Sequence, residues 1–144
     1  MFDALISGVT ASLVAVAMLE VVLIPVWRRC QLSRIAGKYY IHHIDGKPIV
    51  NQAGERNYAI LKVVGWFSQS VDVSGFDYDT NKSWKGVGSF NYDGQCGSLY
   101  YSYDNRVDAG EIRLFKVADA KFAARTYAFH ANVAPAFFWI KTAS

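Results

Sequence analysis

Cysteine and histidine are scarce in this sequence of 144 residues. Its two cysteines, Cys30 and Cys96, are too few for the disulfide framework of a small secreted domain, so we expect both to be free thiols. No Cys/His spacing typical of a zinc site is present. His42 and His43 are adjacent, which directs them to opposite faces of a strand. The sequence therefore excludes a disulfide scaffold and predicts no bound metal.

Signatures of catalysis are also missing. The sequence contains no nucleophile elbow, no phosphate-binding loop and no Gly-rich dinucleotide fingerprint. Its acidic residues stand singly in turn-like segments, and Asp77 and Asp79, which flank Tyr78, have the position of a solvated strand end. No paired carboxylates or histidine-based group suited to acid–base chemistry can be recognised. We predict that the protein is not an enzyme and uses no cofactor.

Charge is almost absent from the amino-terminal segment. Residues 4–27 contain one charged residue, Glu20, and all 15 lysines and arginines lie at Arg28 or later. A helix of this length extends about 36 Å, enough to cross a hydrocarbon core of roughly 30 Å. A cleaved signal peptide is the alternative, with "AVA" at 15–17 as its cleavage pattern. The absence of a basic start and the continuation of the apolar run to Val26 favour an uncleaved anchor.

Basic residues indicate the orientation of this anchor. Arg28, Arg29 and Arg34 follow the span, whereas a single acid precedes it. An excess of basic residues marks the cytoplasmic side of a membrane span. We therefore expect the amino terminus outside, residues 1–34 as a single-pass anchor with a basic juxtamembrane segment, and residues 35–144 as a cytoplasmic domain.

Two features of the anchor bear on whether it does more than tether. By position, Glu20 lies inside the hydrocarbon region, where a carboxylate has to be neutral, paired, or facing protein or water. It either reaches back toward Arg28 or Arg29, or it lines a polar path inside a helical homo-oligomer. Small residues that let helices approach closely share one helix face: Gly8, Ala11, Ser12 and Ala15, with Ala4 and Ser7. Glu20 projects from a different side, so a plain anchor and an oligomer that uses these residues both stay open.

Eight short segments after residue 34 have the composition and spacing of β-strands. Turn residues separate them, and none shows the 3.6-residue period of a helix. The segments are 35–47, 57–67, 68–79, 83–93, 98–104, 110–117, 121–131 and 136–142. They predict a mainly β fold, in which a single transmembrane helix precedes an eight-stranded antiparallel up-and-down (lipocalin-like) β-barrel, since closure removes exposed strand edges. Gly75 interrupts one strand, and we expect a bulge or kink there.

Aromatic residues are abundant, at 15% of the chain. An eight-stranded barrel has an interior that side chains fill, or that holds one small ligand. We interpret most of the rings as packing residues, among them Trp66, Phe90, Phe115, Phe129 and Trp139. Rings with polar tips and arginines that interrupt apolar strands are instead candidate ligand contacts, because arginine binds phosphate and aromatic rings stack on bases. These candidates are Tyr78, Trp84, Tyr101, Tyr103, Arg113, Arg125 and Tyr127. The alternative for each arginine is an ordinary outward-facing position on an alternating strand.

The order of a membrane helix, a basic segment and "IAGKYY" opening an eight-stranded unit, with "SWKG" on a later strand, resembles a bacterial effector family. These are the cyclic-oligonucleotide-gated transmembrane β-barrel effectors of antiphage signalling (CBASS). The resemblance implies a protein of the bacterial inner membrane whose cytoplasmic barrel binds a cyclic nucleotide, oligomerises and disrupts that membrane. The family usually has two membrane spans, whereas this sequence has one. The resemblance therefore supports nucleotide sensing by the barrel more strongly than membrane disruption by the helix.

The predicted function is therefore that of a membrane-anchored antiviral-defence effector. Its expected partners are a cyclic di- or oligonucleotide, membrane lipid and further copies of itself, with no DNA or RNA duplex. The same "Gly-Lys-Tyr" strand start is similar to the opening of lipocalins, which makes a membrane-anchored barrel for a lipid or another small apolar ligand the alternative. A structural membrane-anchored partner that takes no small ligand is a third possibility.

Overall fold

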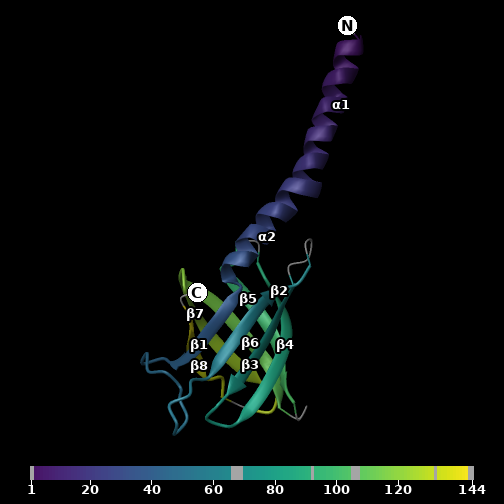
Figure 1. The fold of residues 1–144 in the computed structure, drawn as a ribbon. Coiled ribbons are helices and arrows are strands. Elements are labelled where there is room, and N and C mark those ends of the chain that lie inside the picture. Colours follow the sequence, from purple (N-terminus) through teal and green to yellow (C-terminus); the bar gives the residue numbers. More distant parts are fainter. Residues whose placement is uncertain (1, 66–69, 92, 105–107, 132, 143–144) are drawn as a thin grey trace.

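The computed structural model describes residues 2–65, 70–91, 93–104, 108–131 and 133–142. It consists of one long amino-terminal helix standing on the end of a closed, eight-stranded antiparallel β-barrel (Figure 1). The predicted fold class is confirmed. Trp66, which we expected to be a packing residue, lies outside the described residues.

The helix runs without interruption from α1 (Phe2–Met18) through a π-helical turn, η1 (Leu19–Leu23), into α2 (Ile24–Ile35). In the π-helical turn the Ile24 N–H donates to the carbonyl of Leu19, five residues earlier. Pro25 accounts for this widening, because it has no N–H to donate and its ring displaces the carbonyl four residues earlier. Glu20 lies within this turn. The stretch Gly8–Ile35 is long and apolar enough to cross a membrane.

The barrel strands follow in simple up-and-down order, each hydrogen-bonded to its sequence neighbours, and β1 closes against β8. In the described part of the chain they are β1 (Gly37–His43), β2 (Tyr58–Val63), β3 (Ser70–Asp77), β4 (Lys82–Phe90), β5 (Cys96–Tyr103), β6 (Ala109–Ala118), β7 (Lys121–Ala128) and β8 (Ala136–Lys141). One register shift occurs in these ladders, between Lys116 and Ala118 of β6. Each predicted strand segment therefore overlaps one observed strand, with ends that differ by a few residues.

Alternate residues of each strand face the barrel interior and form its core. Among the predicted packing residues, Phe90 and Trp139 are buried in this core. Phe115 and Phe129 are 50% and 64% exposed, so that prediction is wrong for both. Phe115 lies between Leu114, which is buried, and Lys116 on β6, and the two-residue period directs it outward.

Gly75 does not form the expected bulge. Its register on both sides is regular, with Ala59 of β2 and Trp84 of β4 as partners. A Cβ atom at this position would lie 2.3 Å from the indole ring of Trp84, far closer than carbon atoms approach. The glycine therefore provides the space in which the Trp84 side chain crosses the barrel interior.

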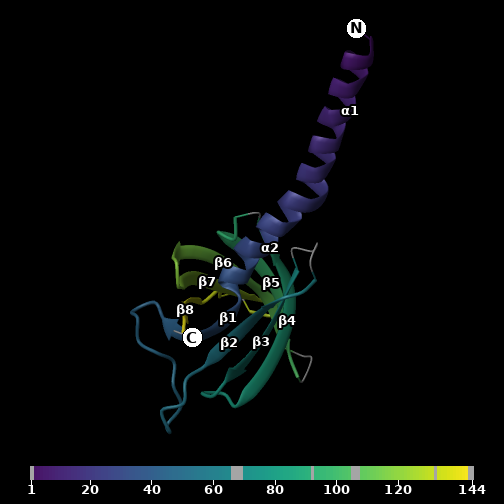
Figure 2. The ribbon, with the colours of Figure 1, turned by 45° about the horizontal axis from the view of Figure 1, so that its top comes forward.

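The end of α2 closes one end of the barrel. Leu32 and Ile35 are 2% and 5% exposed and belong to the barrel core. Figure 2 shows α2 meeting the barrel beside β1. A single residue, Ala36, connects helix and strand, and Gly37 turns the chain into β1 with a φ of +141°, a conformation that favours glycine.

Side chains from the barrel satisfy the carbonyls at this helix end, which have no partners within the helix. The Tyr39 hydroxyl donates to the Ile35 carbonyl over 2.6 Å, and Lys141 Nζ donates to the Arg34 carbonyl over 2.6 Å. The Arg29 guanidinium, one to two turns earlier in the helix, donates to the backbone carbonyl of Gly65, just after β2, over 2.7 Å. A positive charge near a helix carboxyl terminus also interacts favourably with the helix dipole. The helix is thus joined to the barrel by packing and hydrogen bonds as well as by the chain itself.

We expect Leu32→Ala to lower the free energy of unfolding of the barrel by about 2–5 kcal/mol, because it removes a buried side chain from the junction and leaves a cavity. Urea unfolding of the detergent-solubilised chain, followed by tryptophan fluorescence, measures this. The neighbouring exposed Ser33 supplies the control Ser33→Ala, which should unfold close to the wild type. Equal stability of the two variants would contradict the proposed packing of the helix in the barrel.

Candidate ligand-binding cavity at the open end of the barrel

A cavity of about 980 Å³ occupies the barrel end opposite the helix. Its walls come from the ends of β1, β3, β5 and β7, the starts of β4, β6 and β8, and the connections between them. Ligand pockets of small molecules have volumes of about 300–1,000 Å³ and mostly apolar walls with a few polar groups. Here the apolar part includes Ile41, Ile49, Ile112, Phe137 and Trp139. The size and the lining are those of a small-molecule site.

Aromatic rings form a continuous series from this cavity into the core. Tyr103 contacts Tyr101, Tyr101 contacts Trp84, and Trp84 contacts Trp139, with ring centroids 5.8, 6.0 and 6.2 Å apart. All four residues line the cavity. Beyond Trp139 the series continues through Tyr39 toward the helix end of the barrel. The contacts of Tyr101 with Tyr103 and with Trp84 are edge-to-face, and those of Trp139 with Trp84 and with Tyr39 are tilted. Both arrangements restrict the orientation of the rings in the cavity wall.

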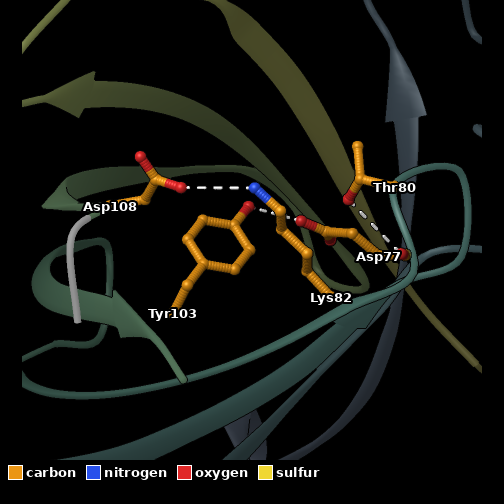
Figure 3. Close-up of polar contacts among 5 residues, drawn as sticks. All are labelled: Asp77, Thr80, Lys82, Tyr103 and Asp108. Carbon is orange, nitrogen blue, oxygen red and sulfur yellow. Dashed lines mark hydrogen bonds and ion pairs between the residues drawn. The ribbon is translucent and has the colours of Figure 1, made fainter. Parts of the chain in front are cut away.

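Asp77, the last residue of β3, places a carboxylate beside these rings (Figure 3). The Trp84 indole N–H donates to its Oδ1 over 3.2 Å, and the Tyr103 hydroxyl donates to its Oδ2 over 2.5 Å. Burial raises the pKa of the Asp77 carboxyl, and these two hydrogen bonds oppose that rise. The pKa of Tyr103 is also raised, first by burial and then by its bond to Asp77, so its hydroxyl stays protonated and donating.

Asn57 holds the turn that follows Asp77. It is 4% exposed and lies just before β2. Its side-chain oxygen accepts the backbone N–H of Tyr78 over 2.7 Å and that of Asp79 over 3.3 Å. Its amide nitrogen donates to Asp79 Oδ1 over 2.7 Å. This clamp positions a second carboxylate, that of Asp79, at the cavity wall.

Acidic side chains outnumber basic ones around this end of the barrel. In the described loops and strand ends the acids are Asp45, Glu55, Asp77, Asp79, Asp104 and Asp108, and the bases are Lys47, Arg56 and Lys82. Lys47 pairs with Asp45 at 3.4 Å and Lys82 with Asp108 at 3.3 Å (Figure 3). Among the described residues, this end of the barrel therefore carries more negative than positive charge, and its acidic side chains offer hydrogen-bond acceptors.

The structure brings together three of the seven predicted ligand residues. Trp84, Tyr101 and Tyr103 lie in the cavity wall. Tyr78 lies in the turn after β3, where its ring contacts Phe76 and Tyr58.

The other three predicted ligand residues lie on the outer surface of the barrel. Arg113 and Arg125 are exposed and face each other across β6 and β7. The Arg113 guanidinium lies 5.0 Å from the centre of the Tyr127 ring and binds Glu111 through contacts of 3.0 and 3.2 Å. Arg113 alternates with the buried Ile112 on β6. Arg125 and Tyr127 alternate on β7 with the buried Ala124 and the cavity-lining Thr126, so all three side chains point away from the cavity.

Asp77 and Asn57 are the site residues that the sequence did not reveal. Asp77 has the same parity as the buried Val71, Val73 and Gly75 on β3, so extending that alternation by one step predicts its inward position. Reading it as a solvated strand end was wrong. No sequence pattern indicates the role of Asn57, because the turn it holds lies more than twenty residues later in the chain.

The predicted membrane contacts are all exposed along the helix: Gly8, Ala11, Ser12, Ala15 and Glu20. The Ser12 hydroxyl donates to the Gly8 carbonyl over 2.9 Å. Cys30 and Cys96 are free and exposed. Within the described ranges, no group of three metal-ligating side chains lies close enough together to hold an ion.

We expect Asp77→Ala to lower the free energy of unfolding by about 1–3 kcal/mol at neutral pH, because it leaves the donors of Trp84 and Tyr103 without an acceptor. The raised pKa means that the folded state holds a proton at Asp77 more tightly than the unfolded state. The deficit of the variant should therefore grow as the pH falls through this raised pKa, and level off below the unfolded-state value.

Urea unfolding at a series of pH values measures both effects. Asp72→Ala is the matched control, since Asp72 is an exposed, outward-facing aspartate of the same strand. A deficit equal to that of the control at every pH would show that Asp77 has no structural role at the cavity.

No protein-family model matches this chain, and no curated protein matches it by sequence. Solved structures do resemble it. A redesigned β-barrel, b11L5F_LGL, superposes with a TM-score of 0.57 at 10% identity, covering 79% of this chain and 96% of that one. The redesigned barrel mFAP1, bound to DFHBI, gives 0.54 at 8% identity over 78% and 98% of the two chains. EF1p2_mFAP2b, also bound to DFHBI, gives 0.51 at 11% identity over 81% and 99%. At such identities the likeness shows the fold alone: a closed β-barrel.

Proposed function

We propose that this chain is a membrane-anchored receptor whose barrel binds a cyclic nucleotide in the cavity at its open end. The observation that carries the proposal is the wall in which Trp84, Tyr101 and Tyr103 stand beside the carboxylate of Asp77. Flat aromatic faces stack on nucleobases, at about 1–3 kcal/mol per base. A carboxylate in such a wall accepts hydrogen bonds from the base edge.

The charges around the cavity define how a nucleotide would enter. The carboxylates of Asp77 and Asp79 in the cavity wall repel phosphate, so the base would enter the cavity and the sugar-phosphate part would stay at the rim. Lys47, Arg56 and Lys82 are the cations of that rim in the described chain. Binding energy then comes mainly from stacking and base hydrogen bonds, with little contribution from long-range attraction.

A second candidate is the lipocalin-like function, in which the cavity takes a neutral, largely apolar ligand. The observation in its favour is that no arginine is among the described residues that line the cavity, while isoleucine, valine and aromatic side chains are. Two of the similar barrels hold a small ligand, DFHBI, which shows that a barrel of this architecture accommodates one.

The output of the receptor is proposed from the resemblance to CBASS effectors. The helix would cross the bacterial inner membrane once with its amino terminus outside, as the arginines after the span indicate. Ligand binding would cluster the cytoplasmic barrels and bring the helices together through Gly8, Ala11, Ser12 and Ala15. Glu20 would then place polarity in the membrane and permeabilise it. Such coupling requires that the ligand binds the clustered state more tightly than the separate one.

Calorimetry on the full chain in lipid nanodiscs tests the ligand. Cyclic dinucleotides should bind to the wild type, and Ala128→Phe, which fills the cavity from β7, should weaken binding at least about tenfold, a free-energy loss of about 1.4 kcal/mol. Arg125→Ala, on the outer face of the same strand, tests the alternative location predicted from sequence. Loss of binding in Arg125→Ala alone would place the site outside the barrel, and binding of a fatty acid in place of nucleotides would favour the second candidate.

Inducible expression in bacteria tests the output. Glu20→Ala and Gly8→Leu should both reduce membrane leakage and restore growth, because one removes the intramembrane carboxylate and the other removes a close helix contact. Dye uptake and growth curves measure the effect at matched protein levels. Val22→Leu, a conservative change at an exposed apolar position of the helix, serves as the control. Undiminished killing by both variants would rule out the proposed helix contacts.

A further inference from the structure

We infer that the cavity selects a base with two adjacent hydrogen-bond donors on its edge, which among the common bases is guanine. This inference rests on the proposed nucleotide binding and adds the choice of base to it. It follows from the hydrogen-bond acceptors that the structure places in the cavity wall.

Asp77 retains acceptor capacity after its contacts within the protein. Each of its oxygens accepts one hydrogen bond in the described chain, from Trp84 and from Tyr103. A carboxylate offers about four acceptor sites in all, so each oxygen can accept one more bond. The two donors come from side chains of β4 and β5, which orient the carboxylate without covering it, since Asp77 lines the cavity.

The surroundings of Asp77 favour an added donor. Its carboxyl group is largely buried, so its charge is short of solvation, and the carboxylate of Asp79 lies near enough to raise its pKa further. Lys82, the cation drawn near Asp77 in Figure 3, is paired with Asp108. A ligand N–H that donates to Asp77 therefore adds a stabilising hydrogen bond that the described protein groups do not make. Hydrogen bonds to charged groups are stronger than those between neutral groups.

The common bases differ in what they present to such a carboxylate. Guanine offers a ring N–H next to an exocyclic amino group, which together match the two oxygens of one carboxylate. Adenine offers one amino group beside a ring acceptor, and uracil offers one ring N–H between two carbonyls, so each would place an acceptor against the carboxylate. A site built to receive donors discriminates strongly against ligands that lack them, because its polar groups are then left unpaired.

The aromatic side chains of the cavity wall orient a bound base relative to Asp77. Trp84 is fixed by its indole bond to Asp77 and by contacts with Tyr101 and Trp139. Trp84 and Tyr101 are 3% and 9% exposed, so the partly exposed ring beside Asp77 on which a purine can stack is that of Tyr103, whose hydroxyl donates to Asp77. Stacking therefore accepts any base, whereas the edge contact to Asp77 distinguishes among them.

The test compares cyclic di-GMP with cyclic di-AMP by calorimetry on the full chain in nanodiscs. Cyclic di-GMP should bind roughly 10- to 100-fold more tightly, the range expected for hydrogen bonds to a charged acceptor. The di-inosine analogue, which keeps the ring N–H and lacks the amino group, should fall between them. This comparison uses the wild-type protein and so does not depend on a variant folding.

Asp77→Asn should remove most of the preference, because its amide presents a donor in place of one acceptor oxygen. Asp72→Asn, on the outer face of the same strand, should keep the preference. Equal binding of all three ligands to the wild type would overturn the inference while leaving the proposed nucleotide binding in place. Failure of all three to bind would overturn both.

Discussion

The seating of the helix end in the barrel is the contact on which the rest of the structure depends. An eight-stranded barrel has an interior just wide enough for side chains to fill. At one end Leu32 and Ile35 complete that filling, and barrel residues satisfy the last carbonyls of the helix. Because the helix closes this end, the cavity lies at the other end. The same contact joins the barrel to the long apolar helix with one intervening residue, so the open end of the barrel points away from that helix.

Large and small side chains are matched across the barrel interior. Gly75 leaves the space that the indole of Trp84 occupies, and Gly97 does the same for the ring of Phe90. Near the helix the rings meet apolar neighbours, while near the mouth their polar tips meet Asp77. One series of rings thus serves as core at one end and as cavity wall at the other. The carboxylate that ends the series gives this wall a hydrogen-bond acceptor.

Strand periodicity carried most of the information that the sequence held about the site. It predicted eight strands. Three of the rings chosen for their polar tips, Trp84, Tyr101 and Tyr103, line the cavity. It was misapplied at Phe115, whose aromatic character was weighed above its outward parity on β6. Arg113 and Arg125, chosen for their phosphate chemistry, occupy positions that strand alternation directs outward, away from the cavity.

What the sequence by itself determined is the apolar span, its basic flank, the strands and the turns between them, because each depends on residues close together in the chain. Tertiary structure alone decided the rest. Closure of β1 on β8 brings rings from four or more strands into one series, and the helix end becomes the plug only because a closed barrel has an end to fill. The burial of Asp77 likewise depends on Trp84, Tyr103 and the distant Asn57 clamp. Side chains that meet across a barrel leave no periodic trace in the sequence, since the register and closure that bring them together are long-range properties.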